Sequence, residues 1–99
     1  MVKRFNKGKL YTLCLANNTN GDINTWCANV QYKTRIHNVL EFHSVNCIYT
    51  VDLDDKIVAI QEREVIEVFN YDTGLFEYDE LDKELMTATL TNIVQGWLW

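Results

Sequence analysis

The stretch between residues 45 and 71 constrains the fold most, because its apolar residues follow the two-residue period of a β-strand. Alternate residues of a strand share a face, so one apolar face is expected: Val45, Cys47, Tyr49, Val51 and Leu53. The Asp-rich segment 52–56 then favours a turn, since Asp bonds readily to nearby backbone groups. The pattern predicts a hairpin at the centre of the fold.

Two apolar runs follow this turn, at residues 57–60 and 65–69, with a polar spacer between them. Their β-branched residues occupy successive positions, which is typical of central strands covered on both faces. A helix is the alternative, because several of these residues also fall near helical spacing and the intervening Glu and Arg are good helix formers.

Shorter patterns predict further strands on either side of this centre. The first strand is expected at residues 10–16, followed by a loop that reaches to about residue 25. Residues 26–37 alternate most regularly, which predicts a long strand with one face in water. Two short strands are expected at residues 39–42 and 75–78, the second after a turn at residues 71–74.

The C-terminal part is predicted to form a helix from about Glu80 to Gly96, with Asp79 as the N-cap. Its apolar residues follow a helical stripe: Leu85, Met86, Leu90, Ile93, Val94 and Trp97. Three threonines argue for a strand instead: Thr87, Thr89 and Thr91. The predicted fold class is therefore α+β, a mostly antiparallel sheet of about five strands with the C-terminal helix packed on one face.

The 99 residues are expected to form one domain, with residues 1–9 as a mobile basic segment. No apolar run is long enough for a membrane span or a secretion signal, so a cytoplasmic protein is expected. The three cysteines form no close pair along the chain, which favours reduced thiols over a disulfide framework: Cys14, Cys27 and Cys47.

Charge is distributed unevenly along the chain. Residues 1–51 contain six basic and two acidic residues, a formal charge of +4, whereas residues 52–84 contain twelve acidic and three basic residues, a charge of −9. Carboxylates at this density repel one another, so they require full solvation or a cationic partner. Solubility alone is the simpler explanation of an acidic surface.

A cationic partner predicts a small non-enzymatic binding protein, an inhibitor that docks its acidic region on the basic, nucleic-acid-binding surface of a larger macromolecule. The candidate partner-binding residues are Asp52, Asp54, Asp55, Glu62, Glu64, Glu67, Asp79 and Glu80. Small acidic proteins of this kind are frequent among virally encoded antagonists of nucleic-acid enzymes, an analogy at the level of protein class only.

A structural or self-associating module is the alternative function. Residues 85–99 carry no charge, and a homodimer could bury Trp97 and Trp99. Direct nucleic-acid binding through the basic N-terminal half is disfavoured, because the acidic half would repel phosphates. Its candidate stacking residues would be Phe5, Trp26 and Tyr32.

The sequence indicates no catalytic or metal site. Ser44 and His43 are adjacent and would point to opposite faces of a strand, and the cysteines lack the paired spacing of zinc sites. Residues 52–63 begin like a calcium loop, but Ile57 replaces its Gly and Arg63 its final Glu. The residue types of a metal-dependent nuclease site are present but follow no recognisable motif: Asp54, Asp55, Lys56, Glu62 and Glu64. We expect no enzyme, metal or cofactor.

Overall fold

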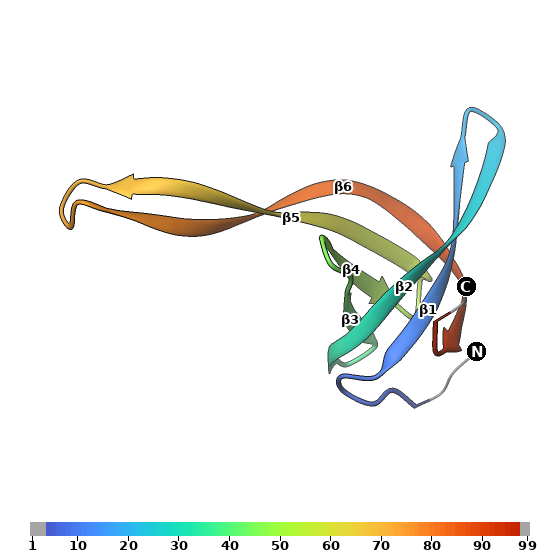
Figure 1. The fold of residues 1–99 in the computed structure, drawn as a ribbon. Coiled ribbons are helices and arrows are strands. Elements are labelled where there is room, and N and C mark those ends of the chain that lie inside the picture. The colour runs from blue at the N-terminus through green and yellow to red at the C-terminus, as the bar shows by residue number, and fades with distance from the viewer. Residues whose placement is uncertain (1–3, 98–99) are drawn as a thin grey trace.

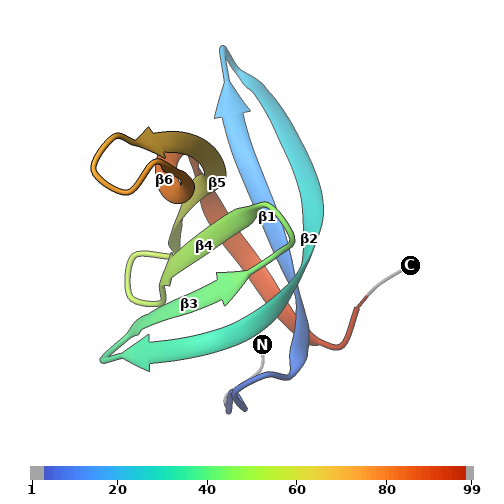
Figure 2. The same ribbon diagram turned by 60° about the vertical axis from the view of Figure 1, so that its left-hand side comes forward.

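A computed structural model of the chain shows six antiparallel strands that close into a barrel in the order β1-β2-β3-β4-β5-β6 (Figures 1 and 2). The structure describes residues 4–97, without the side chains of residues 65, 66 and 79–82. The strands are β1 (Leu10–Thr19), β2 (Asp22–Ile36), β3 (Val39–His43), β4 (Cys47–Asp52), β5 (Ile57–Asn70) and β6 (Leu75–Gln95). The described part of the chain contains no helix that could span a membrane.

The predicted α+β class is wrong, because residues 80–96 do not form a helix. Residues 80–95 belong to β6, which pairs with β5 along its first part and with β1 along its last part. Pairing of β6 with β1 closes the sheet into a barrel, and side chains of β6 fill part of its interior. The protein is all-β, a six-stranded closed antiparallel barrel with a β-hairpin extension.

Two β-bulges explain why the apolar residues of β6 fall near helical spacing. The pairing with β5 shifts between Ile60 and Gln61, which leaves Leu85 as an extra residue. The pairing with β1 shifts similarly and leaves Thr91 as an extra residue. Each bulge inserts one residue into the two-residue period, so the inward-facing positions acquire mixed spacing: Met86, Ala88, Leu90 and Ile93.

Alternate residues of the strands fill the barrel interior with a continuous apolar core: Tyr11, Leu13, Leu15, Ala28, Val30, Tyr32, Leu40, Phe42, Val51, Val58, Ile60, Ala88, Leu90 and Ile93. Phe5 packs on this core, with ring centroids 5.3 to 5.9 Å from those of Tyr11, Tyr32 and Phe42. The backbone of Gly8 donates to Tyr32 O at 2.9 Å, which places the segment before β1 along β2.

The β1–β2 connection is tighter than the predicted loop. Thr19 pairs with Asp22, so only Asn20 and Gly21 form the turn, with positive φ angles of 53° and 86°. Such a two-residue turn matches the twist of the strands it joins. The alternation predicted for β2 is confirmed where Ala28, Val30 and Tyr32 are buried.

The central hairpin is confirmed, but its predicted burial is partly wrong. Asp52 Oδ1 accepts from the backbone amides of Asp54 and Asp55, at 2.9 and 3.2 Å, and shapes the turn between β4 and β5. Val51 is fully buried, whereas Val45 lies outside β4 and is exposed. Residues 57–60 and 65–69 both belong to β5, but Ile57, Val68 and Phe69 are exposed, so this strand is not covered on both faces along its length.

A matched pair of leucine substitutions in β6 tests this division between core and surface. Leu90 is 1% exposed and Leu75 is 66% exposed. We expect Leu90→Ala to lower the free energy of unfolding by about 2–5 kcal/mol, because it leaves a cavity in the core. Leu75→Ala should change it by less than about 0.5 kcal/mol. Denaturant titration measures both, and equal losses would contradict the described burial.

Candidate partner-binding site

The most prominent feature outside the barrel is the outer part of the β5–β6 hairpin, residues 62–83, which we call the arm (Figure 1). β4 pairs with β5 only as far as Glu62, and β1 pairs with β6 only from Thr89 onward. Beyond the Glu62–Lys83 pair, eight residues of β5 run to Asn70 with β6 as their one neighbouring strand among the described residues. At about 3.3 Å per residue, the arm projects roughly 26 Å.

The base of the arm is attached to the barrel by backbone hydrogen bonding. The Arg63 amide donates to Asn46 O at 2.8 Å, which links β5 to the connection between β3 and β4. The Leu85 bulge lies next to this point, where bulges bend a strand and increase its twist. The arm therefore leaves the barrel at a defined place.

The turn at the end of the arm is held by Asn70. Its Oδ1 accepts from the amides of Asp72 and Thr73, at 2.9 and 3.4 Å, and its Nδ2 donates to Glu77 Oε1 at 3.0 Å. The Gly74 amide donates to Asn70 O at 2.9 Å, and Gly74 has a positive φ of 72° that favours glycine. These bonds give the turn, predicted correctly at residues 71–74, a specific shape.

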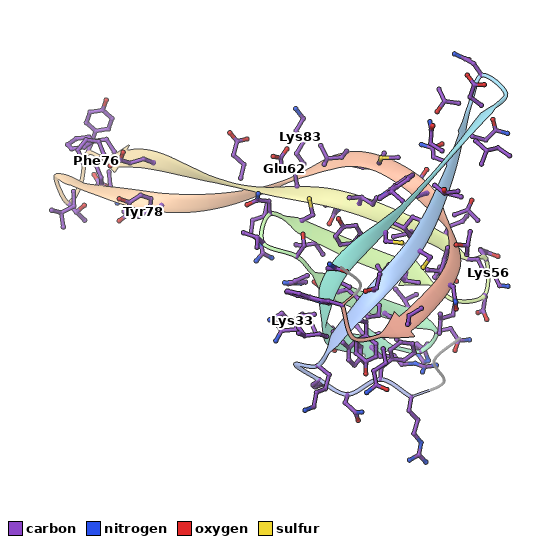
Figure 3. All side chains as sticks on the ribbon, turned by 45° about the vertical axis from the view of Figure 1, so that its right-hand side comes forward. Lys33, Lys56, Glu62, Phe76, Tyr78 and Lys83 are labelled. Atoms are coloured by element: carbon purple, nitrogen blue, oxygen red, sulfur yellow. The ribbon has the colours of Figure 1, made fainter. Side chains whose placement is uncertain are left out.

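Aromatic side chains gather at this end of the arm: Phe69, Tyr71, Phe76 and Tyr78, which we call the aromatic tip. The Phe69 ring centroid lies 5.0 Å from that of Tyr71 and 5.1 Å from that of Phe76, both in edge-to-face arrangements. Tyr71 is 89% and Tyr78 is 72% exposed. Figure 3 shows Phe76 and Tyr78 at the far end of the arm and Glu62 nearer the barrel. The ring contacts join Phe69, Tyr71 and Phe76 into one exposed cluster, and an exposed apolar patch on a projection is typical of an interaction site.

The predicted acidic residues divide into two groups. Asp52, Asp54 and Asp55 lie at the β4–β5 turn, where Asp52 caps the turn and Asp54 accepts from Asn38 Nδ2 at 3.1 Å. Glu62 lies five residues along β5 from the start of that strand, about 17 Å away. The structure therefore does not bring all eight predicted residues onto one surface.

The second group lies on the arm. Glu62, Glu64 and Glu67 have exposed side chains, and Glu67 lies opposite Tyr78 in the strand pairing. Asp79 and Glu80 are part of β6, where they pair with residues 66 and 65 of β5. The structure does not describe their side chains. Residues 62–83 contain eight acidic and two basic residues, a formal charge of −6. The arm is an acidic ribbon that ends in aromatic residues.

The residues predicted to mediate self-association contribute differently. Most of the inward-facing apolar side chains of residues 85–95 fill the barrel core. Trp97 is 38% exposed, and its Nε1 donates to Val30 O at 3.0 Å, while Trp99 lies outside the described residues. Trp97 borders a shallow groove of about 610 Å³ on the outside of the barrel.

The other candidates from the sequence do not form a reactive centre. His43 Nε2 lies 2.8 Å from Glu41 Oε1, while Ser44 Oγ accepts from the Cys47 amide at 3.2 Å. Of the residues whose positions are described, no three His, Cys, Asp or Glu form a group that could hold a metal. Phe5 and Tyr32 pack within the barrel, which removes two of the three aromatic residues considered for nucleic-acid stacking.

Comparisons with protein-family models, curated proteins and solved structures found no match to the chain. The candidate site is therefore supported by the geometry of the described residues alone.

Sequence reasoning did not identify the aromatic tip. The run at residues 65–69 has the composition of a buried strand, and that interpretation placed Phe69 in the core. Four aromatic residues within ten positions, on both sides of a predicted turn, were the available signal. The end of a hairpin is rarely buried, so this clustering points to an exposed patch.

Replacing Asn70 tests whether its side chain gives the turn its shape. Asn70→Ala removes the acceptor for the amides of Asp72 and Thr73, so we expect these amides to exchange with solvent at least about tenfold faster. Asn70→Asp keeps an acceptor oxygen for both amides, and pairing it with Glu77→Gln removes the repulsion from the Glu77 carboxylate, so this double variant should retain most of the protection. Hydrogen exchange followed by NMR measures both variants, and unchanged exchange in Asn70→Ala would contradict the assigned role.

Proposed function

We propose that this protein is a non-enzymatic binding protein whose arm inserts its aromatic tip into an apolar pocket of a partner protein, with the acidic flanks against lysines and arginines around that pocket. The supporting observation is a preformed arm that exposes a contiguous aromatic cluster away from the barrel. The partner class is a protein with a basic, nucleic-acid-binding surface, and docking there would block that surface.

The aromatic tip is expected to supply most of the affinity. Burying one large apolar side chain contributes about 1.5–3 kcal/mol, and aromatic residues are enriched among the positions that dominate interfaces. Tyr71, Phe76 and Tyr78 are largely exposed, so their burial is still available to a partner. The hydroxyl groups of the two tyrosines can also form hydrogen bonds at the pocket rim.

The acidic flanks are expected to supply orientation and association rate. A charge of −6 over residues 62–83 attracts a basic surface and repels an acidic one. Exposed pairs of this kind add little affinity and weaken with salt, because ions screen them over about 8–10 Å. Charge on the arm therefore selects the partner, and the aromatic tip holds it.

Preorganisation also favours binding through the arm. The bonds of Asn70 and the contacts of Phe69 with Tyr71 and Phe76 fix the turn before any partner arrives. A group ordered in advance loses less conformational entropy on binding. The arm is thus a ready-made ligand for a complementary pocket.

Other classes of partner suit the arm less well. Nucleic acids and anionic lipid surfaces carry phosphates, which the carboxylates of the arm would repel. A second copy would bring a second arm with the same negative charge. The exposed Trp97 beside the barrel groove is the observation that supports the homodimer alternative.

Matched variants of the full chain test this proposal. A tip variant replaces Tyr71, Phe76 and Tyr78 by Ser, and its control is Ile23→Ser, which removes another exposed apolar residue at the end of the β1–β2 hairpin. Proteins captured from a lysate are identified, and affinities are then measured with the purified partner. We expect the tip variant to bind at least about 100-fold more weakly and Ile23→Ser to bind normally.

Charge variants and alternative ligands complete the test. Glu62→Gln, Glu64→Gln and Glu67→Gln together should weaken binding about fivefold to tenfold and reduce its salt dependence, whereas Asp22→Asn with Asp55→Asn should not. The purified partner should lose nucleic acid when the protein is added. Three results would contradict the proposal. The tip variant could capture the same partner as the wild type, or the arm could bind single-stranded DNA or anionic vesicles. The third is a dimer on a sizing column that disappears in Trp97→Ala.

A further inference from the structure

Two cysteines face each other on the outside of the barrel. Cys14 in β1 and Cys27 in β2 are direct partners in the strand pairing, and their sulfur atoms lie 3.9 Å apart. Leu13 and Leu15 are buried in the core, so the intervening Cys14 side chain is directed outward, as Cys27 is next to buried Ala28. Their separation of thirteen residues in the sequence concealed this proximity.

The strand pairing holds the two thiols close to disulfide geometry. Directly opposite residues of antiparallel strands have Cα atoms about 4.5–5.5 Å apart, within the range of about 4.4–6.8 Å found in disulfides. The register is fixed by the Asn20–Gly21 turn and by the inward-facing residues on either side of both cysteines. Bond formation therefore requires rotation of the side chains and little movement of the backbone.

We propose that Cys14 and Cys27 form a redox-active dithiol, which a small-molecule disulfide such as oxidised glutathione converts into a cross-strand disulfide. This modification site is separate from the arm and does not depend on the proposed function.

The oxidation proceeds by two thiol–disulfide exchanges. The exposed Cys27 reacts first as its thiolate: its sulfur bonds to one sulfur of oxidised glutathione, the glutathione S–S bond breaks, and one glutathione leaves as a thiolate. Cys14 then loses its proton and attacks the Cys27 sulfur, which releases the second glutathione. The two cysteines are oxidised, one glutathione disulfide is reduced to two thiols, and the two cysteine protons end on those thiols.

The surroundings of the pair support this order. Burial, followed by the neighbouring Cys27 thiol, raises the pKa of the Cys14 thiol, so its thiolate is less available at neutral pH. Cys27 is exposed and accessible to a small oxidant. Cys47 lies in β4 and packs against the barrel core, so it serves as an internal control within the same chain.

Oxidation should stabilise the barrel where it closes. Cys14 lies at the register shift between β1 and β6, and its carbonyl oxygen accepts from Thr91 Oγ1 at 2.9 Å. A disulfide would close a loop of twelve residues, 15–26, and restrict the unfolded chain. We expect the midpoint of thermal unfolding to rise by roughly 10 °C in the oxidised protein.

The test equilibrates the 99-residue chain with oxidised and reduced glutathione and then analyses it by mass spectrometry and thiol counting. We expect the wild type to lose about 2 Da and to retain one of its three thiols, with a peptide map that joins Cys14 to Cys27. Cys47→Ser should form the same bond. Cys14→Ser should stop at a mixed disulfide of Cys27 with glutathione, because the resolving thiol is absent.

Three results would overturn the proposal. They are mixed disulfides in the wild type without loss of glutathione, a bond that involves Cys47, and disulfide-linked dimers on a non-reducing gel. Cys27→Ala replaces an exposed side chain and should remain folded, so the absence of an intramolecular bond in that variant reports on chemistry and not on unfolding.

Discussion

Closure of the barrel by hydrogen bonding between β6 and β1 is the constraint on which the rest of the structure depends. β6 has 21 residues, but its pairing with β1 extends only from Thr89 to Gln95. Likewise β4, with six residues, covers only the first part of β5. The remaining lengths of β5 and β6 have each other as neighbours, so they must project from the barrel (Figure 1). The arm follows from the unequal lengths of the strands.

A projecting two-stranded ribbon has no core of its own, and its side chains reflect this. Carboxylates along the arm keep it solvated, and charged residues on exposed strand edges oppose pairing with other strands. The exposed apolar residues near the end of the arm depart from this composition: Val68, Phe69, Tyr71, Leu75, Phe76 and Tyr78. The tip contributes nothing to the barrel core, which is why we propose that a partner covers its exposed rings.

The strands and turns could be predicted where the signal was local. The alternation in β2 reflects side-chain periodicity within one strand. The turns at Asp52 and at residues 71–74 reflect hydrogen bonds between a side chain and backbone amides two or three residues away. The helix assigned to residues 80–96 was wrong because the bulges at Leu85 and Thr91 depend on pairing with distant strands. Periodicity within one segment carries no information about such partners.

The candidate site was predictable only in part, for the same reason. Glu62, Glu64 and Glu67 do lie on an exposed ribbon, but Asp52, Asp54 and Asp55 belong to a separate turn. A run such as residues 65–69 looks alike whether neighbouring strands cover it or not, so the composition of that run alone could not show that Phe69 is exposed. The proximity of Cys14 and Cys27 likewise appears only once the strands are paired.

Site-specific photo-crosslinking tests the role of the aromatic tip most directly. A photoreactive phenylalanine analogue placed at Phe76 reports what lies within a few ångströms of the tip, and the same analogue at Ile23 reports on the end of the other hairpin. The account predicts a crosslink to one protein from position 76, at a site lined by apolar residues and surrounded by lysines or arginines, and none from position 23. Equal crosslinking from both positions, or crosslinks from position 23 alone, would contradict it.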